Sequence, residues 1–166
     1  MEPSLLDRYN DQIALEHAAE RAYLQMAAWA AANDFNGAAA WFRSQAAEES
    51  EHAAIFTEFV LDRDGEVRLA ALEAPRADFP SLVAVFEAAL EHERKVTASI
   101  AELYGHAQEL RDFRSMPLLT RFLDEQVEEE ASVSTILGEL RMVVDDPSAT
   151  LMLDRELPSR RGAGEG

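Results

Sequence analysis

The stretch AAEESEHA, residues 46–53, sets a glutamate and a histidine into an apolar helical stripe. Glu49 and His52 are three residues apart, so they lie on the same face of a helix. Steps of three and four residues continue this stripe to Phe42 on one side and to Phe56 on the other. Because apolar residues at this spacing indicate the buried face of a helix, the sequence predicts two ligand-type side chains inside the core.

The same pattern recurs in three other segments. Helical periodicity predicts four long helices, at residues 4–33, 36–65, 80–106 and 115–145. In each of them a glutamate interrupts the apolar stripe near the midpoint, and these residues are Glu16, Glu49, Glu93 and Glu129. Helices of similar length that pack side by side place their midpoints at one level. We therefore expect the four carboxylates to converge in the centre of a bundle.

The lengths of the connections predict the topology. Only a few residues around Asp34 join the first two predicted helices, and the last two are joined as closely, so each pair is antiparallel. A fully extended link of about 15 residues at positions 65–79 reaches roughly 50 Å. A helix of about 28 residues is only roughly 42 Å long. The third helix can therefore start parallel to the second, which predicts an all-α four-helix bundle with one long crossover.

The C-terminal part of the chain predicts a shorter element. Asp146 and Pro147 fit the N-cap and the first position of a short fifth helix. We expect residues 1–157 to form one domain, since this length is typical of a single domain. Residues 158–166 are rich in glycine and arginine, and we expect them to form a disordered tail.

The four predicted carboxylates need a counter-charge. An unpaired charge in a protein interior costs several kcal/mol, and the stripes around these glutamates contain no lysine or arginine. Two divalent cations would balance four carboxylates, with His52 neutral. Hard oxygen ligands with one imidazole suit iron or manganese better than copper or a structural zinc.

The composition excludes several other classes of protein. Fifteen basic residues stand against 32 acidic residues, and the net charge of −17 argues against binding to nucleic acid or to an anionic membrane. The chain has no cysteine, which excludes disulfides and thiolate metal sites. It has no signal peptide pattern and no apolar run approaching the ~20 residues that would cross a bilayer. We therefore expect a cytoplasmic protein.

The residues around these glutamates resemble the non-haem bacterial ferritins over nearly the whole chain, from about Tyr9 to Leu157. The resemblance is carried by residues 12–16, with Tyr23 and Trp29 downstream, and by residues 46–53, 91–93 and 122–129. It implies a ferritin-like bundle with ferroxidase activity, which oxidises Fe(II) with O2 or H2O2. It also implies a homo-oligomeric, usually 24-subunit shell that stores the ferric mineral.

The resemblance also implies roles for individual residues. Glu16, Glu49 and His52 match the ligands of a first iron, with Glu49 as the bridge to a second. The second iron has the matching ligands Glu93 and Glu129, with Gln126 nearby, and Tyr23 matches the tyrosine that family members keep beside the centre. A third iron site of the bacterial members is matched by Glu48, Glu125 and Glu128. Two irons per subunit are therefore expected, and a third if this last site forms.

Four observations qualify the resemblance. Bacterioferritins have a second Glu-x-x-His where this chain has Gln126 and Glu129, which favours the ferritin type. Ser50 stands where haem-binding relatives use methionine, so no haem is expected. Arg121 replaces an aromatic residue that many bacterial ferritins have there, and leaves the source of further electrons open. Glu20, one turn after Glu16, either extends an entry path for iron or faces solvent.

Two alternatives share the bundle. A ferritin-like di-metal oxidase would use the same ligands but store no iron, and an interaction bundle would hold no metal. At the third site, the run of glutamates at positions 128–130 would also fit a solvated helix face.

Overall fold

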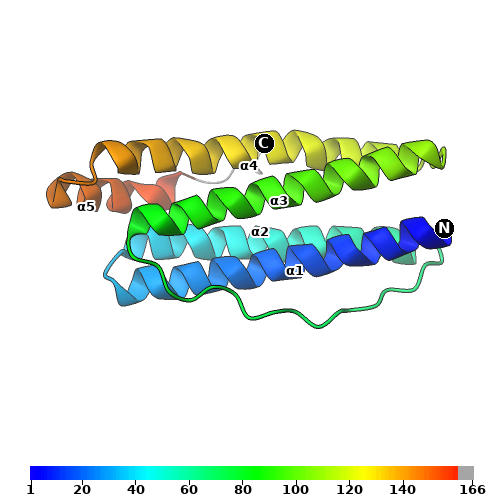
Figure 1. Cartoon of the computed structure of the whole chain (residues 1–166), viewed down its shortest axis with the longest axis horizontal. Helices are drawn as coiled ribbons and strands as arrows, with labels where there is room; N and C mark the ends of the chain where they lie inside the picture. Colours follow the sequence, from blue (N-terminus) through cyan, green and yellow to red (C-terminus); the bar gives the residue numbers. More distant parts are fainter. Residues whose placement is uncertain (161–166) are drawn as a thin grey trace.

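The computed structural model describes residues 1–160, and it confirms the predicted all-α bundle with one long crossover (Figure 1). The elements are α1 (Pro3–Ala32), α2 (Asn36–Leu61), α3 (Leu82–Glu109), α4 (Met116–Met142), α5 (Pro147–Glu156) and a short 3-10 helix (Leu157–Ser159). None of the helices in the described part of the chain is both long and apolar enough to cross a membrane.

Side-chain caps and left-handed residues set the helix ends. The Ser81 hydroxyl accepts a hydrogen bond from the Ala84 N–H, and so fixes the start of α3. Asp64 and Arg111 have φ values of 55° and 54°, in the left-handed region that ends a helix. Helix α2 therefore ends a few residues before the predicted boundary at Gly65, while α3 runs past Gly105 to Glu109.

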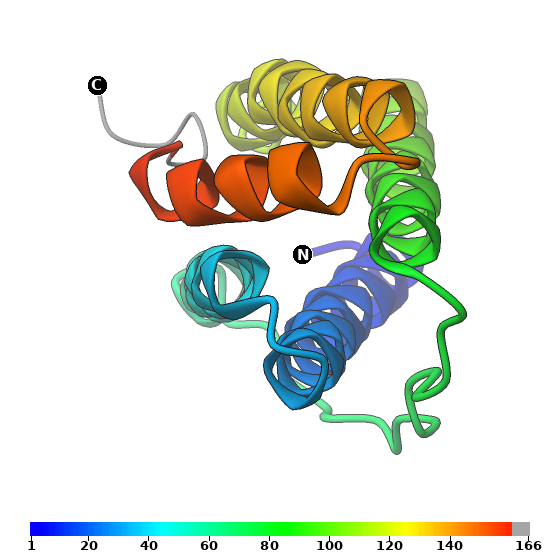
Figure 2. The same cartoon turned by 90° about the vertical axis from the view of Figure 1, so that its left-hand side faces the viewer.

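The crossover determines which helices run in parallel. Helix α1 packs mainly on α2, and α3 packs mainly on α4, as antiparallel pairs (Figures 1 and 2). The segment between α2 and α3 runs along the length of the bundle beside α1, so that α3 starts at the same end as α2. The midpoints of the four helices therefore lie at one level, as the sequence predicts.

A polar layer divides the core. One cluster of buried apolar side chains, which includes Phe42 and Phe86, lies towards α5, and the other, which includes Tyr9 and Phe122, lies towards the N-terminus of the chain. Between them lie the buried polar residues Gln12, Glu16, Gln45, Glu49, His52, Glu93, Gln126 and Glu129. Apolar packing on both sides thus holds a layer of polar groups in the middle of the bundle.

Helix α5 lies at the end of the bundle, between the ends of α4 and α2 (Figure 2). The N-cap of α2, Phe35, provides no side-chain hydrogen bond. The buried carboxylate of Asp154 on α5 caps α2 instead, by accepting from the N–H groups of Gly37 at 3.1 Å and Ala38 at 2.7 Å. A Cβ at position 37 would lie 1.7 Å from the Asp154 carbonyl oxygen, so this contact requires glycine.

The helical structure continues beyond Leu157, the residue at which the domain was predicted to end. The 3-10 helix follows α5 directly, and Arg160 forms ion pairs with Glu139 and with Glu156. Residues 158–160 of the predicted tail thus pack on the bundle in this structure. Residues 161–166, the rest of that predicted tail, lie outside the described residues.

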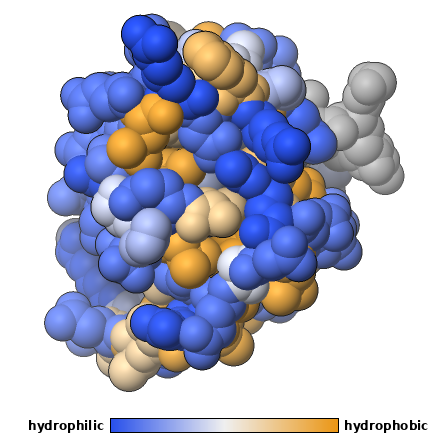
Figure 3. Space-filling view, turned by 90° about the vertical axis from the view of Figure 1, so that its right-hand side faces the viewer, coloured by the Kyte–Doolittle hydropathy of each residue, from blue (hydrophilic) through white to orange (hydrophobic). Residues whose placement is uncertain are grey.

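The opposite end of the bundle exposes several apolar side chains among charged ones (Figure 3). This end carries the start of α1, the end of α2 and the turn between α3 and α4. Leu61 and Leu110 are exposed there, and Phe113 has an exposed fraction of 74%. Single exposed apolar residues are normal on protein surfaces.

Candidate metal centre

Six of the predicted ligand-type residues lie in the polar layer and come from all four long helices. Each is buried, with an exposed fraction of at most 6%; they are Glu16, Glu49, His52, Glu93, Gln126 and Glu129. Charged side chains are rarely buried to this extent without a partner. The layer is therefore the strongest candidate for a functional site in the described part of the chain.

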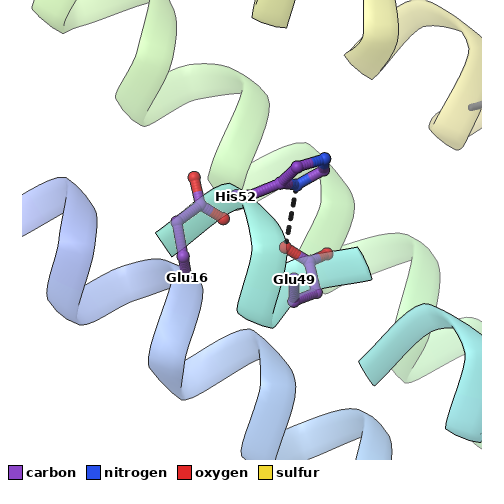
Figure 4. A group of neighbouring side chains, drawn as sticks. All are labelled: Glu16, Glu49 and His52. Carbon is purple, nitrogen blue, oxygen red and sulfur yellow. Dashed lines mark ion pairs between the residues drawn. The ribbon is translucent and has the colours of Figure 1, made fainter. Parts of the chain in front are cut away.

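Glu16, Glu49 and His52 form the tightest group in this layer (Figure 4). Each offers a ligand atom, and these atoms all lie within 4.8 Å of one another. His52 Nδ1 lies 3.4 Å from Glu49 Oε2. The Oε2 atoms of Glu16 and Glu49 are shielded from solvent and accept no hydrogen bond. Two carboxylate oxygens and a ring nitrogen are thus open to one bound cation, as carboxylate–histidine metal sites require.

The remaining residues of the layer form a second group beside the first. Tyr23 donates its hydroxyl hydrogen bond to Glu93 Oε1, and Gln126 Nε2 donates to Glu93 Oε2 at 3.1 Å. Glu129 Oε2 accepts from Gln45 Nε2 at 3.2 Å. Glu93 and Glu129 do not join the close group of Glu16, Glu49 and His52 in this structure. Their carboxylates are instead oriented by neutral donors.

Burial and mutual repulsion disfavour the charged forms of all four glutamates. Burial raises the pKa of Glu16 and Glu49 well above the ordinary value, and Glu93 adds to the rise of the Glu49 pKa. The pKa of Glu93 is also raised by burial. Burial and the neighbouring Glu48 raise the pKa of Glu129 to about 8. Like-charged groups that raise one another's pKa lie close together, and a cation between them would reverse the shift.

No basic side chain relieves this repulsion. Within residues 1–160, none of the four glutamates forms an ion pair with a lysine or an arginine, and the single ion pair in the layer joins Glu49 to His52. A buried cluster of carboxylates is stable as charged groups only with counter-ions. The chemistry of this donor set therefore fits divalent metal ions.

Three further polar residues complete the layer. Ser99 donates to Gln12 Oε1 at 2.6 Å, and Gln12 Nε2 donates in turn to Glu16 Oε1 at 2.7 Å. Gln45 contacts Glu48 as well as Glu129. None of these three residues was predicted from the sequence to belong to the site. The spacing of four between Gln12 and Glu16 would have indicated the first contact, whereas nothing in the sequence marks Ser99.

The predicted third-site residues are only partly brought together. Glu48 and Glu125 are half-buried, and both contribute to the raised pKa of Glu129. Glu128 is exposed on α4. Glu20, whose role the sequence left open, contacts His17 at 3.2 Å and lines a surface pocket between α1 and α2.

The comparisons with known proteins agree with this geometry. The family model described as a ferritin-like domain matches residues 6–143. A bacterial non-heme ferritin of Staphylococcus aureus (strain MRSA252) is 35% identical over 157 residues, which cover 95% of each chain. The bacterial non-heme ferritin of Staphylococcus saprophyticus is also 35% identical, over 94% of this chain and 93% of that one.

Solved structures show the same likeness. An engineered closed form of Archaeoglobus fulgidus ferritin superposes with a TM-score of 0.94, at 37% identity over 98% of this chain and 99% of that chain. The open-pore ferritin of the same archaeon gives a TM-score of 0.93 at 37% identity, over 95% of this chain and 98% of that chain. The bundle, the buried carboxylate layer and these relatives together show that the chain belongs to the ferritin family.

Proposed function

We propose that this protein oxidises Fe(II) at the carboxylate layer and stores the ferric product inside a shell made of 24 copies of the chain. The observation that supports this most strongly is the buried set of four glutamates without a basic partner. Fe(II) is the substrate and the cargo of this reaction. The names of the relatives, which are ferritins, agree with an iron-binding role.

The proposed ligands follow from the two groups in the layer. Glu16, Glu49 and His52 bind the first Fe(II), and Glu93 and Glu129 bind the second. Glu49 bridges the two ions, because it belongs to the first group and interacts electrostatically with both glutamates of the second. Gln126 and Tyr23 hold the two oxygens of Glu93 in place.

The oxidation balances with two iron ions. Each Fe(II) gives up one electron, and O2 takes up two electrons and two protons to become H2O2. Fe(III) has a higher charge than Fe(II), so buried carboxylates stabilise the product more than the substrate. Tyr23 donates a hydrogen bond to Glu93, and we propose that its phenol can supply one of these two electrons in place of an Fe(II), with the phenol proton passing to Glu93.

Two features support assembly into a shell. The end of α4, the turn after it and α5 expose four large apolar side chains at one end of the bundle, which are Met142, Val144, Leu151 and Met152. Exposed apolar residues that cluster in this way indicate contact with another protein surface. The charge of −17 on each copy would make the channels and the inner wall of the shell acidic, which concentrates Fe(II).

A measurement of size and iron content tests this proposal. The purified protein should elute at several hundred kilodaltons and should take up many Fe per chain when Fe(II) is added in air. A small species that oxidises Fe(II) but keeps no more than the centre can hold would indicate the non-storing oxidase instead. Less than one Fe per two chains would indicate a bundle without a metal role.

A further inference from the structure

Gln12 connects a hydroxyl group of α3 to one of the proposed iron ligands. It lies on α1, one turn before Glu16, and its exposed fraction is 1%. The half-buried Ser99 donates its hydroxyl hydrogen bond to Gln12 Oε1 at 2.6 Å, and Gln12 Nε2 donates to Glu16 Oε1 at 2.7 Å. Two hydrogen bonds thus link α3 through α1 to the carboxylate of Glu16.

The chemistry of the three groups fixes the direction of these hydrogen bonds. A charged carboxylate can only accept, so the amide of Gln12 must turn its nitrogen towards Glu16. The amide oxygen then faces Ser99, whose hydroxyl can donate to it. A reversed amide would place its oxygen against the carboxylate. Ser99 therefore holds Gln12 in the one orientation that donates to Glu16.

The contact with Gln12 leaves one oxygen of Glu16 open to a cation. Glu16 Oε1 accepts from Gln12, whereas Oε2 is shielded from solvent and accepts no hydrogen bond. Glu16 also offers a ligand atom to the close group that it forms with Glu49 and His52. An amide is neutral and does not repel a cation, as an arginine in its place would. Gln12 therefore orients Glu16 and leaves its negative charge available.

The carboxylates proposed to bind the second ion also accept from buried glutamines. Gln126 Nε2 donates to Glu93 Oε2 at 3.1 Å, and Gln45 Nε2 donates to Glu129 Oε2 at 3.2 Å. Both glutamines have an exposed fraction of 1%. A glutamate that becomes ordered loses side-chain freedom, which costs free energy. A donor that orders the ligand during folding removes this cost from the binding step.

We propose that Gln12, oriented by Ser99, is a positioning residue for the first Fe(II) site, which holds Glu16 with one oxygen directed to the ion. This inference rests on the proposed function of the two-ion centre. Replacement of a residue that orients a metal ligand typically lowers metal affinity by about 10- to 100-fold. The loss should be confined to the first ion, because the ligands of the second ion have hydrogen-bond donors of their own.

Binding of Co(II) tests this role without any oxidation of iron. Calorimetric titration of the assembled protein gives the affinities of the two ions. Anomalous diffraction from crystals soaked at a series of Co(II) concentrations gives the occupancy of each site separately. In Gln12→Leu, which removes the amide at similar size, the ion at Glu16, Glu49 and His52 should bind about 10- to 100-fold more weakly. The other ion should keep its wild-type affinity.

Two variants of Ser99 separate the hydrogen bond from packing, and they give a milder test if Gln12→Leu does not fold. Ser99→Ala removes the hydroxyl that orients Gln12, so it should weaken the first ion in the same direction and by less. Ser99→Thr keeps the hydroxyl and should restore the wild-type affinity. Gln25→Leu is the matched control, because Gln25 is a half-buried glutamine of the same helix, and both affinities should stay unchanged.

Three results would overturn the positioning role. They are an unchanged first ion in Gln12→Leu and Ser99→Ala, an equal loss at both sites, and a loss in Ser99→Thr as large as in Ser99→Ala. If the wild type binds no ion at Glu16, Glu49 and His52, the proposed function fails, and this inference with it. Two bound ions in the wild type, together with any of the three results, overturn only the inference.

Discussion

Replacing Glu49 with alanine is expected to slow Fe(II) oxidation at least about a hundredfold. Substitution of a residue that only supports a metal ligand already lowers metal affinity or activity by about 10- to 100-fold, and Glu49 is a proposed ligand itself. Glu49 is the carboxylate that joins the two groups of the layer. It lies beside Glu16 and His52, and its pKa is raised by Glu93 and Glu129 after the larger effect of burial. Without Glu49, no carboxylate would hold the two iron ions next to each other. His52→Ala should have a similar effect through loss of the first ion.

The test of Glu49 needs a control for folding and one for charge. Stopped-flow absorbance of Fe(III) formation gives the rate, and circular dichroism should show unchanged helical content, because alanine removes a buried charge from a helix. Glu51 lies on the same helix and is exposed, so Glu51→Ala should keep the wild-type rate. Unchanged oxidation in both Glu49→Ala and His52→Ala would refute the ligand assignment.

The metal-free protein is expected to lose stability as the pH rises from about 4.5 to 8. Glu129 has a pKa of about 8 in the folded chain, against an ordinary value of 4.5. The folded state therefore keeps its proton in this range while the unfolded state releases one, which favours unfolding as the pH rises. The loss from this group amounts to at most roughly 5 kcal/mol, and it is complete above pH 8. Glu16, Glu49 and Glu93, whose pKa values are also raised, change stability in the same direction.

Denaturant unfolding at pH 5 and pH 8.5, with and without a divalent ion, checks this prediction. Bound metal stabilises the charged carboxylates, so it should remove most of the loss at the higher pH. Glu129→Gln should reduce the dependence on pH in the metal-free protein. Asp124→Asn, at an exposed position of α4, should leave it unchanged. Equal pH dependence in Glu129→Gln and the wild type would show that Glu129 is not a buried, charge-sensitive group.

The sequence predicted the features that depend on local periodicity. The positions of Glu16, Glu49, Glu93 and Glu129 in a common buried layer follow from helical spacing and from helices of similar length. The start of α5 at Pro147, with Asp146 as its cap, is local in the same way and is confirmed. The predicted helix ends were less accurate where a non-glycine residue with a left-handed backbone conformation follows the helix.

Contacts between distant segments could not be predicted. Asp154 caps α2 across 117 positions, and Ser99 contacts Gln12 across 87. Such pairs depend on how the helices cross and how far each is rotated, which one sequence does not specify. The pair of Arg121 and Glu125 is different, since a spacing of four on a helix predicts this contact directly. From the sequence, Arg121 is distinguished only as a departure from the pattern of the family.

The measurement that tests the central claim most directly is anomalous diffraction from crystals soaked in Fe(II) without oxygen. Two iron peaks should appear inside each bundle, one in contact with Glu16, Glu49 and His52, and the other with Glu49, Glu93 and Glu129. Iron found only on the outer surface, with the buried carboxylates free of metal, would contradict the claim that this layer exists to bind a pair of iron ions.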